Sequence, residues 1–450
     1  MTTRRAFLAQ LGAAAAITAL PDVARAMGRT PLGGRVSLHV PWPTGAIDPH
    51  DLRDGAAALF ASAIADPAYA LDATGAPYPS LATGLPVREA GETLVHLREG
   101  MRTARLVPLD ARDLVATVLR AKASGAAALL ADIPRPKLRR GDPYAVSFGS
   151  VEPLHLARVL ASPLVAVLPR RFSPTVPDGT GAFRADVSPS GLVLTRNLHA
   201  ARGPSFLDAI RVAPADGLKT SLRAFESERD DIGWLGLGLH DGRRGAIRFD
   251  LGRAAWVVLT TGPDTGGFGL PGVAQRLVDA IPPERLAHLG LGPRPPARGD
   301  PGWGGAPAEL LVDESSPHLV DVARAVAPVL SRTGHEVTAT LVSRAELARR
   351  RARGKAPLTI ELVRPLGPSP LHTLLSLATA EDVARGRDLA RSPPRLRPGA
   401  PARSMTSMLR VGVIGEIRVA GGVIPDLALA KSPSGDGWDL GATFRKPVRR

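Results

Sequence analysis

Apolar and polar residues follow two different spacings along this chain. Residues 35–40 alternate, with Val36, Leu38 and Val40 on one face, which predicts a half-buried strand. Residues 318–330 instead place apolar side chains three and four positions apart, which predicts an amphipathic helix. Further helices are predicted over 52–65, 111–119, 154–160, 273–281 and 344–355, and strands over 94–100, 165–169, 191–197, 254–259, 336–342 and 408–423. Helices that alternate with strands are typical of α/β domains.

Composition changes this picture little, but it excludes several classes of protein. Of the 450 residues, 44% are hydrophobic and 22% are charged, as in globular proteins. The formal net charge is +15, yet arginine is spread along the whole chain and no basic run is interleaved with aromatic residues. We therefore predict no nucleic-acid partner. The chain has no cysteine, which excludes disulfides, thiolate metal sites and cysteine nucleophiles.

The first 26 residues have the pattern of an export signal. Arg4 and Arg5 form a twin-arginine pair ahead of an apolar run over 11–20, and Ala24 and Ala26 are small residues at the positions that a signal peptidase reads. The alternative is an N-terminal membrane anchor, but the run is shorter than the roughly 20 residues that a membrane-spanning helix needs. We therefore predict a cleaved twin-arginine signal and a mature protein that is soluble in the periplasm.

The stretch from Gly179 to Ile210 carries the most specific motifs of the sequence. It contains Gly-Thr-Gly-Ala-Phe at 179–183, Leu-Thr-Arg-Asn at 194–197 and Gly-Pro-Ser-Phe-Leu-Asp-Ala-Ile at 203–210, which predict a Gly-rich turn followed by strands. This combination resembles the signature of the peptide/nickel-type extracellular solute-binding proteins, called family 5, which hand ligands to ABC importers. Residues 76–82, 94–100 and 108–114 resemble further motifs of the same family.

The resemblance covers most of residues 33–450 and implies an α/β fold, namely the two-lobed periplasmic binding protein fold of class II (cluster C) type with a ligand cleft between the lobes. On this basis we assign residues 27–232 to the first part of lobe I, 233–407 to lobe II and 408–450 to a return to lobe I. Hinge closure around a ligand is the motion that this architecture implies.

The sequence contains no recognisable catalytic or metal-binding pattern. It has no G-x-S-x-G, H-E-x-x-H, Walker A or G-x-G-x-x-G motif. The ten histidines never fall within four residues of one another, so no local metal site is visible. We therefore predict no enzyme activity, no catalytic residue, no metal and no cofactor, although a site assembled from distant residues stays open.

Residues 363–370 are the sharpest candidate for ligand contact. They align with the family motif W-x-A-D-Y-P-D-P, whose first aspartate pairs with the ligand's ammonium group in oligopeptide-binding members, but Leu366 stands at that position here. We predict that Arg364 is the polar anchor of the pocket and that Trp42 and Trp256 are its apolar walls. An exposed salt bridge is the alternative role for Arg364, and a place in the core or in a lid is the alternative for each tryptophan.

These observations predict a periplasmic substrate-binding protein of an ABC importer. Its partners would be a small-molecule solute, peptide-like or other, and the permease subunits of the importer, and the protein itself would be a monomer. A degenerate, non-transporting binding or sensory protein of the same fold is the alternative, because the cleft motif is eroded. An exported hydrolase is a third hypothesis, but the sequence contains no catalytic motif that supports it.

Overall fold

The computed structural model describes residues 32–234, 243–263, 265–292 and 308–446. The signal predicted over residues 1–26 lies outside this part of the chain, and so does most of the loop predicted between 291 and 307. None of the helices formed by the described residues has the length and apolar character that a bilayer crossing requires.

A four-stranded sheet joins segments that lie far apart in the sequence. Its order is β1 (Arg35–Val40), β10 (Ala209–Pro214), β9 (Gly191–Arg196) and β8 (Phe183–Ser188). β1 runs parallel to β10, whereas β10, β9 and β8 are antiparallel neighbours. The alternation predicted for residues 35–40 is confirmed, because Val36, Leu38 and Val40 are buried. The motif-rich stretch therefore supplies β8, β9 and the start of β10.

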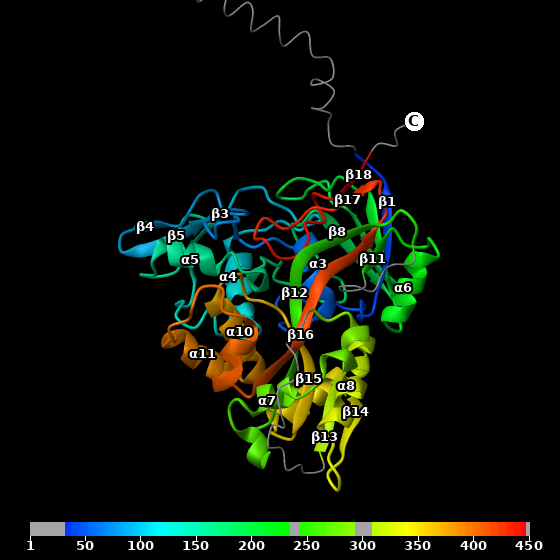
Figure 1. The fold of residues 1–450 in the computed structure, drawn as a ribbon. Coiled ribbons are helices and arrows are strands. Elements are labelled where there is room, and N and C mark those ends of the chain that lie inside the picture. Colours follow the sequence, from blue (N-terminus) through cyan, green and yellow to red (C-terminus); the bar gives the residue numbers. More distant parts are fainter. Residues whose placement is uncertain (1–31, 235–242, 264, 293–307, 447–450) are drawn as a thin grey trace, which may run out of the picture.

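A six-stranded sheet forms the long axis of the molecule. Its order is β11 (Ile232–Trp234), β16 (Val411–Val423), β12 (Ile247–Thr261), β15 (Leu358–Val363), β13 (Ala308–Asp313) and β14 (Val337–Val342). The long strands β12 and β16 are antiparallel, and Figure 1 shows them running from the end that contains β11 to the end that contains β13 and β14. The mixed α/β architecture is thus built around β12 and β16, which extend into both ends of the molecule.

The remaining strands are short and form three small sheets. β4 (Val87–Glu89) pairs with β5 (Glu92–His96) in a hairpin, and β5 covers the start of the strand predicted over 94–100. β5 also pairs with β7, which pairs with β6. The bounds of the others are β2 (Tyr69–Leu71), β3 (Pro77–Pro79), β6 (Lys137–Leu138), β7 (Ala145–Ser147), β17 (Leu427–Ala428) and β18 (Phe444–Arg445).

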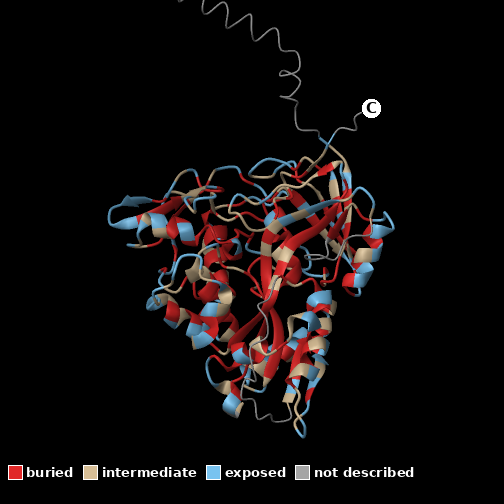
Figure 2. Ribbon diagram, viewed as in Figure 1, coloured by how far each residue is buried: buried red, intermediate tan, exposed pale blue. Residues whose placement is uncertain are grey.

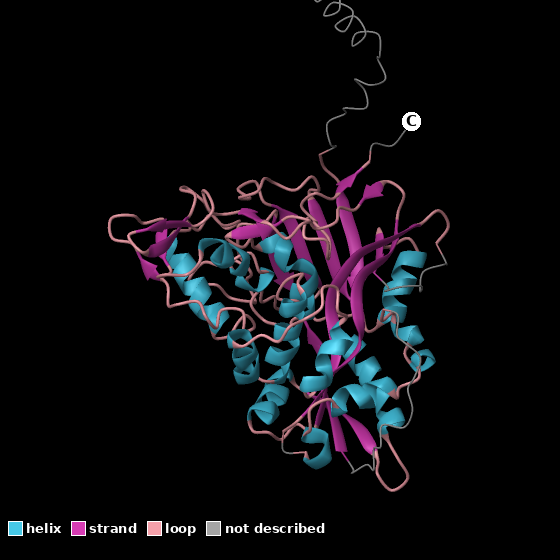
Figure 3. Cartoon of the chain, turned by 60° about the vertical axis from the view of Figure 1, so that its left-hand side comes forward, coloured by secondary structure: helices cyan, strands magenta, loops and turns pink. Residues whose placement is uncertain are grey.

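Helices flank the long strands on both sides (Figure 3). Their bounds are α3 (Gly55–Ile64), α4 (Ala111–Lys122), α5 (Pro153–Val159), α6 (Leu218–Glu226), α7 (Val273–Asp279), α8 (Pro317–Leu330), α9 (Arg344–Ala352), α10 (Pro370–Glu381) and α11 (Val383–Arg391). Short 3-10 turns cover Pro163–Val165, Gly266–Gly269, Pro283–Arg285, Ala287–Leu289 and Ala402–Met408. α6, α10 and α11 were not predicted.

Helix capping explains where two of these helices begin. Asp110 caps α4 and exchanges hydrogen bonds with Asp113 in a capping box, which confirms the predicted start. The helix predicted over residues 52–65 begins later than expected, at Gly55. Asp54 is the cap of α3, because its carboxylate accepts a hydrogen bond from the amide of Ala57 (2.9 Å), whereas Asp51 pairs with Arg344.

The strand predicted over residues 165–169 is also wrong. The residues are buried as expected, but their backbone groups form hydrogen bonds with two side chains and one carbonyl oxygen, and not with a neighbouring strand. The amide of Val167 donates to the carbonyl oxygen of Asp66 (2.8 Å), the carbonyl oxygen of Ala166 lies 2.8 Å from His50 Nε2, and the amide of Leu168 donates to Thr117 (2.9 Å). A buried segment needs partners for its polar backbone, and here a sheet does not supply them.

Two large hydrophobic cores lie on opposite faces of β12. Ala255, Val257 and Leu259 belong to the first core, and Trp256 and Val258 belong to the second. Side chains alternate between the two faces of a strand, so one run of apolar residues serves both cores. The buried residues of Figure 2 accordingly continue from one end of the molecule to the other. Residues 52–167 and 363–413 together supply most of the second core, and where the lobes divide along the chain stays a prediction.

The Gly-rich turn predicted at 179–183 packs directly against the end of α3. The amide of Gly181 donates to the carbonyl oxygen of Ile64 (2.9 Å), and a Cβ at Gly181 would lie 2.5 Å from the carbonyl oxygen of Ala63. We expect Gly181→Ala to lower the free energy of unfolding by about 1–3 kcal/mol, because backbone must move to admit the methyl group. Urea denaturation measures this, with Gly84→Ala as control, since a Cβ at Gly84 meets nothing within 4 Å. Equal stabilities of the two variants would contradict the packing.

Candidate functional site

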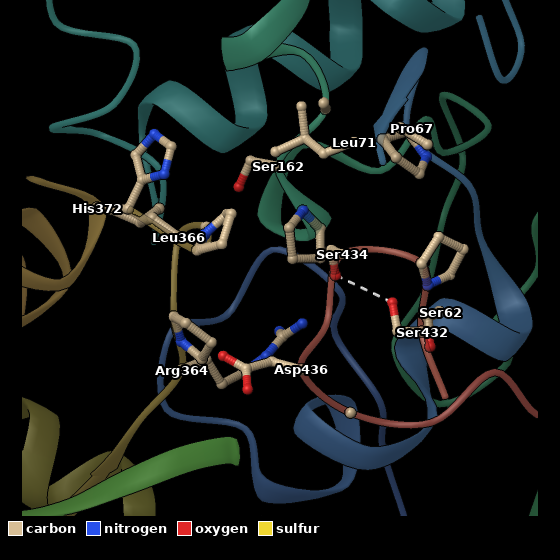
Figure 4. Close-up of a pocket in the computed structure, with 18 of the residues that line it drawn as sticks. Ser62, Pro67, Leu71, Ser162, Arg364, Leu366, His372, Ser432, Ser434 and Asp436 are labelled. Atoms are coloured by element: carbon tan, nitrogen blue, oxygen red, sulfur yellow. Dashed lines mark hydrogen bonds between the residues drawn. The ribbon is translucent and has the colours of Figure 1, made fainter. Parts of the chain in front are cut away.

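Segments from several parts of the chain enclose a cavity of about 200 Å³ (Figure 4). The contributing segments are α3, residues 67–78, residues 158–163, residues 253–254 in the middle of β12, residues 364–368 and residues 432–438. Residues 364–368 belong to the segment whose alignment predicted ligand contact. The cavity therefore lies where the loop between β15 and α10 faces α3 and the C-terminal loop.

The walls of this cavity are mainly apolar. Leu59, Leu71, Pro163, Leu366 and Trp438 all line it. Trp438 is fixed in place because its indole Nε1 donates a hydrogen bond to the carbonyl oxygen of Leu59 (2.6 Å). Apolar walls with few polar groups are characteristic of small-molecule sites, in which the polar groups fix the orientation of the ligand.

Arg364 is the most deeply buried charge on the wall. It follows the fully buried strand β15 and is only 3% exposed. Its Nη1 donates to the carbonyl oxygens of Pro49 and Asp51, both at 2.9 Å. Burial lowers the pKa of Arg364 below its usual value, but a guanidinium stays protonated in proteins. Within the described residues, Nη2 and Nε make no hydrogen bond, so these donors are free for a ligand.

Arg253 is held by carboxylates on two sides. Its Nη2 lies 3.1 Å from Asp436, and its Nη1 lies 3.3 Å from Glu416. Its guanidinium also lies over the indole ring of Trp256, 4.4 Å from the ring centre. Among the described residues, Asp436 is the carboxylate that lines the cavity, and it is already paired with Arg253.

The three predicted site residues lie in different surroundings. Arg364 lines the cavity. Trp256 is fully buried beneath Arg253, and Trp42 is buried in the first core, where its ring meets the edge of His318 with 5.1 Å between the ring centres. The two tryptophans are not among the residues that line the cavity. Ligand contact by any of the three stays a prediction.

Several lining residues were not predicted from the sequence. Asp436 and Trp438 lie in a C-terminal segment that the sequence assigned only to the return to lobe I, and His372 lies in α10, which has no recognisable helical pattern. Arg158 and Arg253 line the cavity too, but nothing distinguishes them from the many other arginines of the sequence. Proline and glycine around 433–437 were the sole signal that this loop had a special shape.

A metal or cofactor site finds no support in the part of the chain that the structure describes. No group of three or more histidine, aspartate or glutamate side chains is arranged there to hold a metal ion. The cavity contains one carboxylate and one imidazole among arginines, serines and apolar residues. Such a lining suits hydrogen bonding to an organic ligand better than coordination of a cation.

Comparison with solved structures identifies the architecture. The oligopeptide-binding protein AppA from Bacillus subtilis, solved in complex with a nonapeptide, aligns with 93% of this chain and 100% of its own, at a TM-score of 0.67 and 12% sequence identity. The periplasmic binding protein DppA from Helicobacter pylori, solved with the peptide STSA, aligns with 93% of this chain and 99% of its own, at a TM-score of 0.68 and 14% identity.

The chain has the two-lobed periplasmic binding protein fold. NikA from Brucella suis, solved with Fe(III)-EDTA, has this fold as well and aligns with 92% of this chain and 100% of its own, at a TM-score of 0.61 and 14% identity. The resemblance to solute-binding family 5 is thus confirmed at the level of the fold. A scan against protein-family models finds no match, and a search of curated proteins finds none either.

The ligands in these structures differ widely, from peptides to a metal chelate. One fold therefore serves several ligand chemistries, and the fold alone does not identify the ligand of this chain. The ligand has to be inferred from the side chains that line its own cavity.

Proposed function

We propose that this chain is the substrate-binding protein of an ABC importer, exported to the periplasm, where it binds a small organic solute and delivers it to a membrane permease. The observation that carries this proposal is Arg364: a buried guanidinium with unused donors faces a cavity in a binding-protein fold. Ligand binding between two lobes of a monomer, rather than catalysis, accounts for such a site.

The charges around the cavity favour a neutral or anionic solute. Leu366 stands where the family's aspartate would bind an ammonium group, and its side chain lines the cavity. The one lining carboxylate, Asp436, is already paired with Arg253. A buried ammonium group without a carboxylate partner would lose its hydration without compensation, whereas a carboxylate could accept two hydrogen bonds from Arg364.

Peptides with a free amino terminus should therefore bind poorly. We expect isothermal titration calorimetry against a panel of dipeptides and tripeptides to show no tight binding, because no free carboxylate of the described residues lines the cavity. Micromolar affinity that disappears when the peptide is N-acetylated would contradict this expectation.

Arg364→Gln should weaken binding of an anionic solute by about 10–100-fold, because a charge-assisted hydrogen bond is lost from a desolvated site. Calorimetry on the solute that co-purifies with the protein measures the change. Arg112→Gln is the matched control, since Arg112 is an exposed arginine of α4 that does not line the cavity. Arg364→Lys tests whether a positive charge alone is enough for binding. Unchanged affinity in both Arg364 variants would show that Arg364 does not contact the ligand.

A further inference from the structure

The cavity has polar groups at two separate ends. Arg364 and Asp436 lie at one end, and Figure 4 shows Ser162 and His372 at the other. Arg158, which also lines the cavity, lies on the last turn of α5, one helical turn before Ser162. The charge of His155, another residue of α5, acts on His372, so α5 and His372 are neighbours.

The four arginines on the cavity wall are not equally compensated. Arg253 has two carboxylate partners, and Arg202 lies 3.6 Å from Asp66. Arg158 and Arg364, in contrast, have no carboxylate within 4 Å among the described residues. Two positive charges on the cavity wall are therefore left without a direct partner among the described residues.

Carboxylates that lie near Arg364 have other partners. Asp48 forms an ion pair with Arg120 (2.7 Å), and Asp51 pairs with Arg344. Asp54 accepts hydrogen bonds from the backbone amides of Asp48 and Ala57. These three groups lie on the side of Arg364 that faces residues 48–54, so its cavity side stays open to a ligand.

His372 adds a neutral hydrogen-bond donor at the end of the cavity opposite Arg364. Its Nδ1 is buried without a partner beside Gly367, where an added Cβ would lie only 2.3 Å from it. A buried N–H without an acceptor is costly, which favours the tautomer with the proton on Nε2. Burial and the nearby His155 lower the pKa of His372 to about 4, so the ring is neutral at neutral pH. Nε2 thus carries the N–H of a ring that lines the cavity.

We infer that the ligand carries two separated acidic groups joined by an apolar body, with one group bound by Arg364 and the other by Arg158 and His372. The apolar body would contact apolar residues of the lining, such as Leu71, Pro163 and Leu366. This inference rests on the proposed function, and it narrows the solute from any neutral or anionic molecule to a dianion. Arg158 is exposed, so the second acidic group lies near water and contributes less than the first.

A series of dicarboxylic acids of increasing length, from succinate to suberate, tests the inference together with the monomethyl and dimethyl esters of each acid. We expect at least one diacid to bind in calorimetry, about tenfold more tightly than its monoester, with the diester weakest. Arg158→Gln should bring the affinity of that diacid close to that of the monoester, and His372→Leu should lower it severalfold. Arg112→Gln should keep the native preference.

The outcomes separate this inference from the proposed function. Equal binding of a diacid and its monoester, or binding of a neutral solute when no diacid binds, overturns the inference and leaves the receptor function standing. An unchanged diacid preference in Arg158→Gln overturns the role of Arg158 and with it the second anionic subsite. If no diacid, ester or peptide binds and no solute co-purifies, both the inference and the receptor function fail.

Discussion

Replacing Glu361 by glutamine should lower the free energy of unfolding by about 3–5 kcal/mol. Glu361 lies on β15, is 4% exposed, and contacts Arg53 at 3.2 Å and Arg351. Burial alone would raise the pKa of this carboxyl, but the two guanidinium groups outweigh burial and hold the pKa below its usual value. The glutamine variant keeps the shape of the side chain and removes the charge.

The cost arises because Arg351 has no other carboxylate partner in the part of the chain that the structure describes, and it has little access to water. Its side chain is 19% exposed, and its remaining recorded bonds go to the backbone oxygens of Ala380 and Glu381. A buried cation without its counter-ion loses hydration that nothing replaces. Arg351 also connects β15 to α9 and to the end of α10, so loss of the ion pair should destabilise the packing of these three elements.

Urea denaturation at neutral pH measures the effect, and Glu346→Gln is the matched control. Glu346 pairs with Arg349 and Arg350 at the surface of α9, where water screens the charges, so its loss should matter far less. A Glu361→Gln protein that is as stable as the Glu346→Gln protein would contradict the buried ion pair as a source of stability.

Acidification from pH 6.5 to 4 should destabilise the protein, because three histidines are buried in the neutral form. Burial lowers the pKa of His50, His318 and His372 from 6.5 to about 4 in each case. In the unfolded chain these rings take up a proton near pH 6.5, so between pH 6.5 and 4 the unfolded state binds more protons. Stability therefore falls with pH in that window, by roughly 3 kcal/mol for each histidine at pH 4.

His318→Phe isolates the contribution of one ring. His318 lies in the first core with its ring against Trp42, and phenylalanine preserves that aromatic contact without a titratable group. The free energy of unfolding of the variant should fall less steeply between pH 6.5 and 4 than that of the native protein. The two proteins should differ little in slope above pH 7, and equal slopes below pH 6.5 would show that His318 is not buried in the neutral form.

Much of the fold follows from local pattern in the sequence. Alternation identified β1, the capping residue Asp110 marked the start of α4, and the Gly-rich motif at 179–183 marked the turn that contacts α3. The alignment of 363–370 also pointed to residues that line the cavity, Arg364 among them. These features depend on neighbours in sequence, and a motif of glycines, prolines or capping side chains records them directly.

Sequence pattern failed where burial is uniform. Residues 373–380 of α10 are all buried, so the helix shows little contrast between an apolar and a polar face. Residues 165–168 have the apolar run of a buried strand but bond to His50, Asp66 and Thr117 instead. An apolar run indicates burial and does not by itself specify which partner receives its backbone groups.

The sequence by itself thus determined the fold class, the motifs of the binding-protein architecture and the loop that borders the cavity. Only the tertiary structure decided that Trp42 lies in the core against His318, and that Asp436 forms an ion pair with Arg253, which is distant in the sequence. The physical reason is that a charge or an aromatic ring has no fixed role until its neighbours are known. Arg158 and Arg364 differ from the other arginines of the cavity solely in what the fold places beside them.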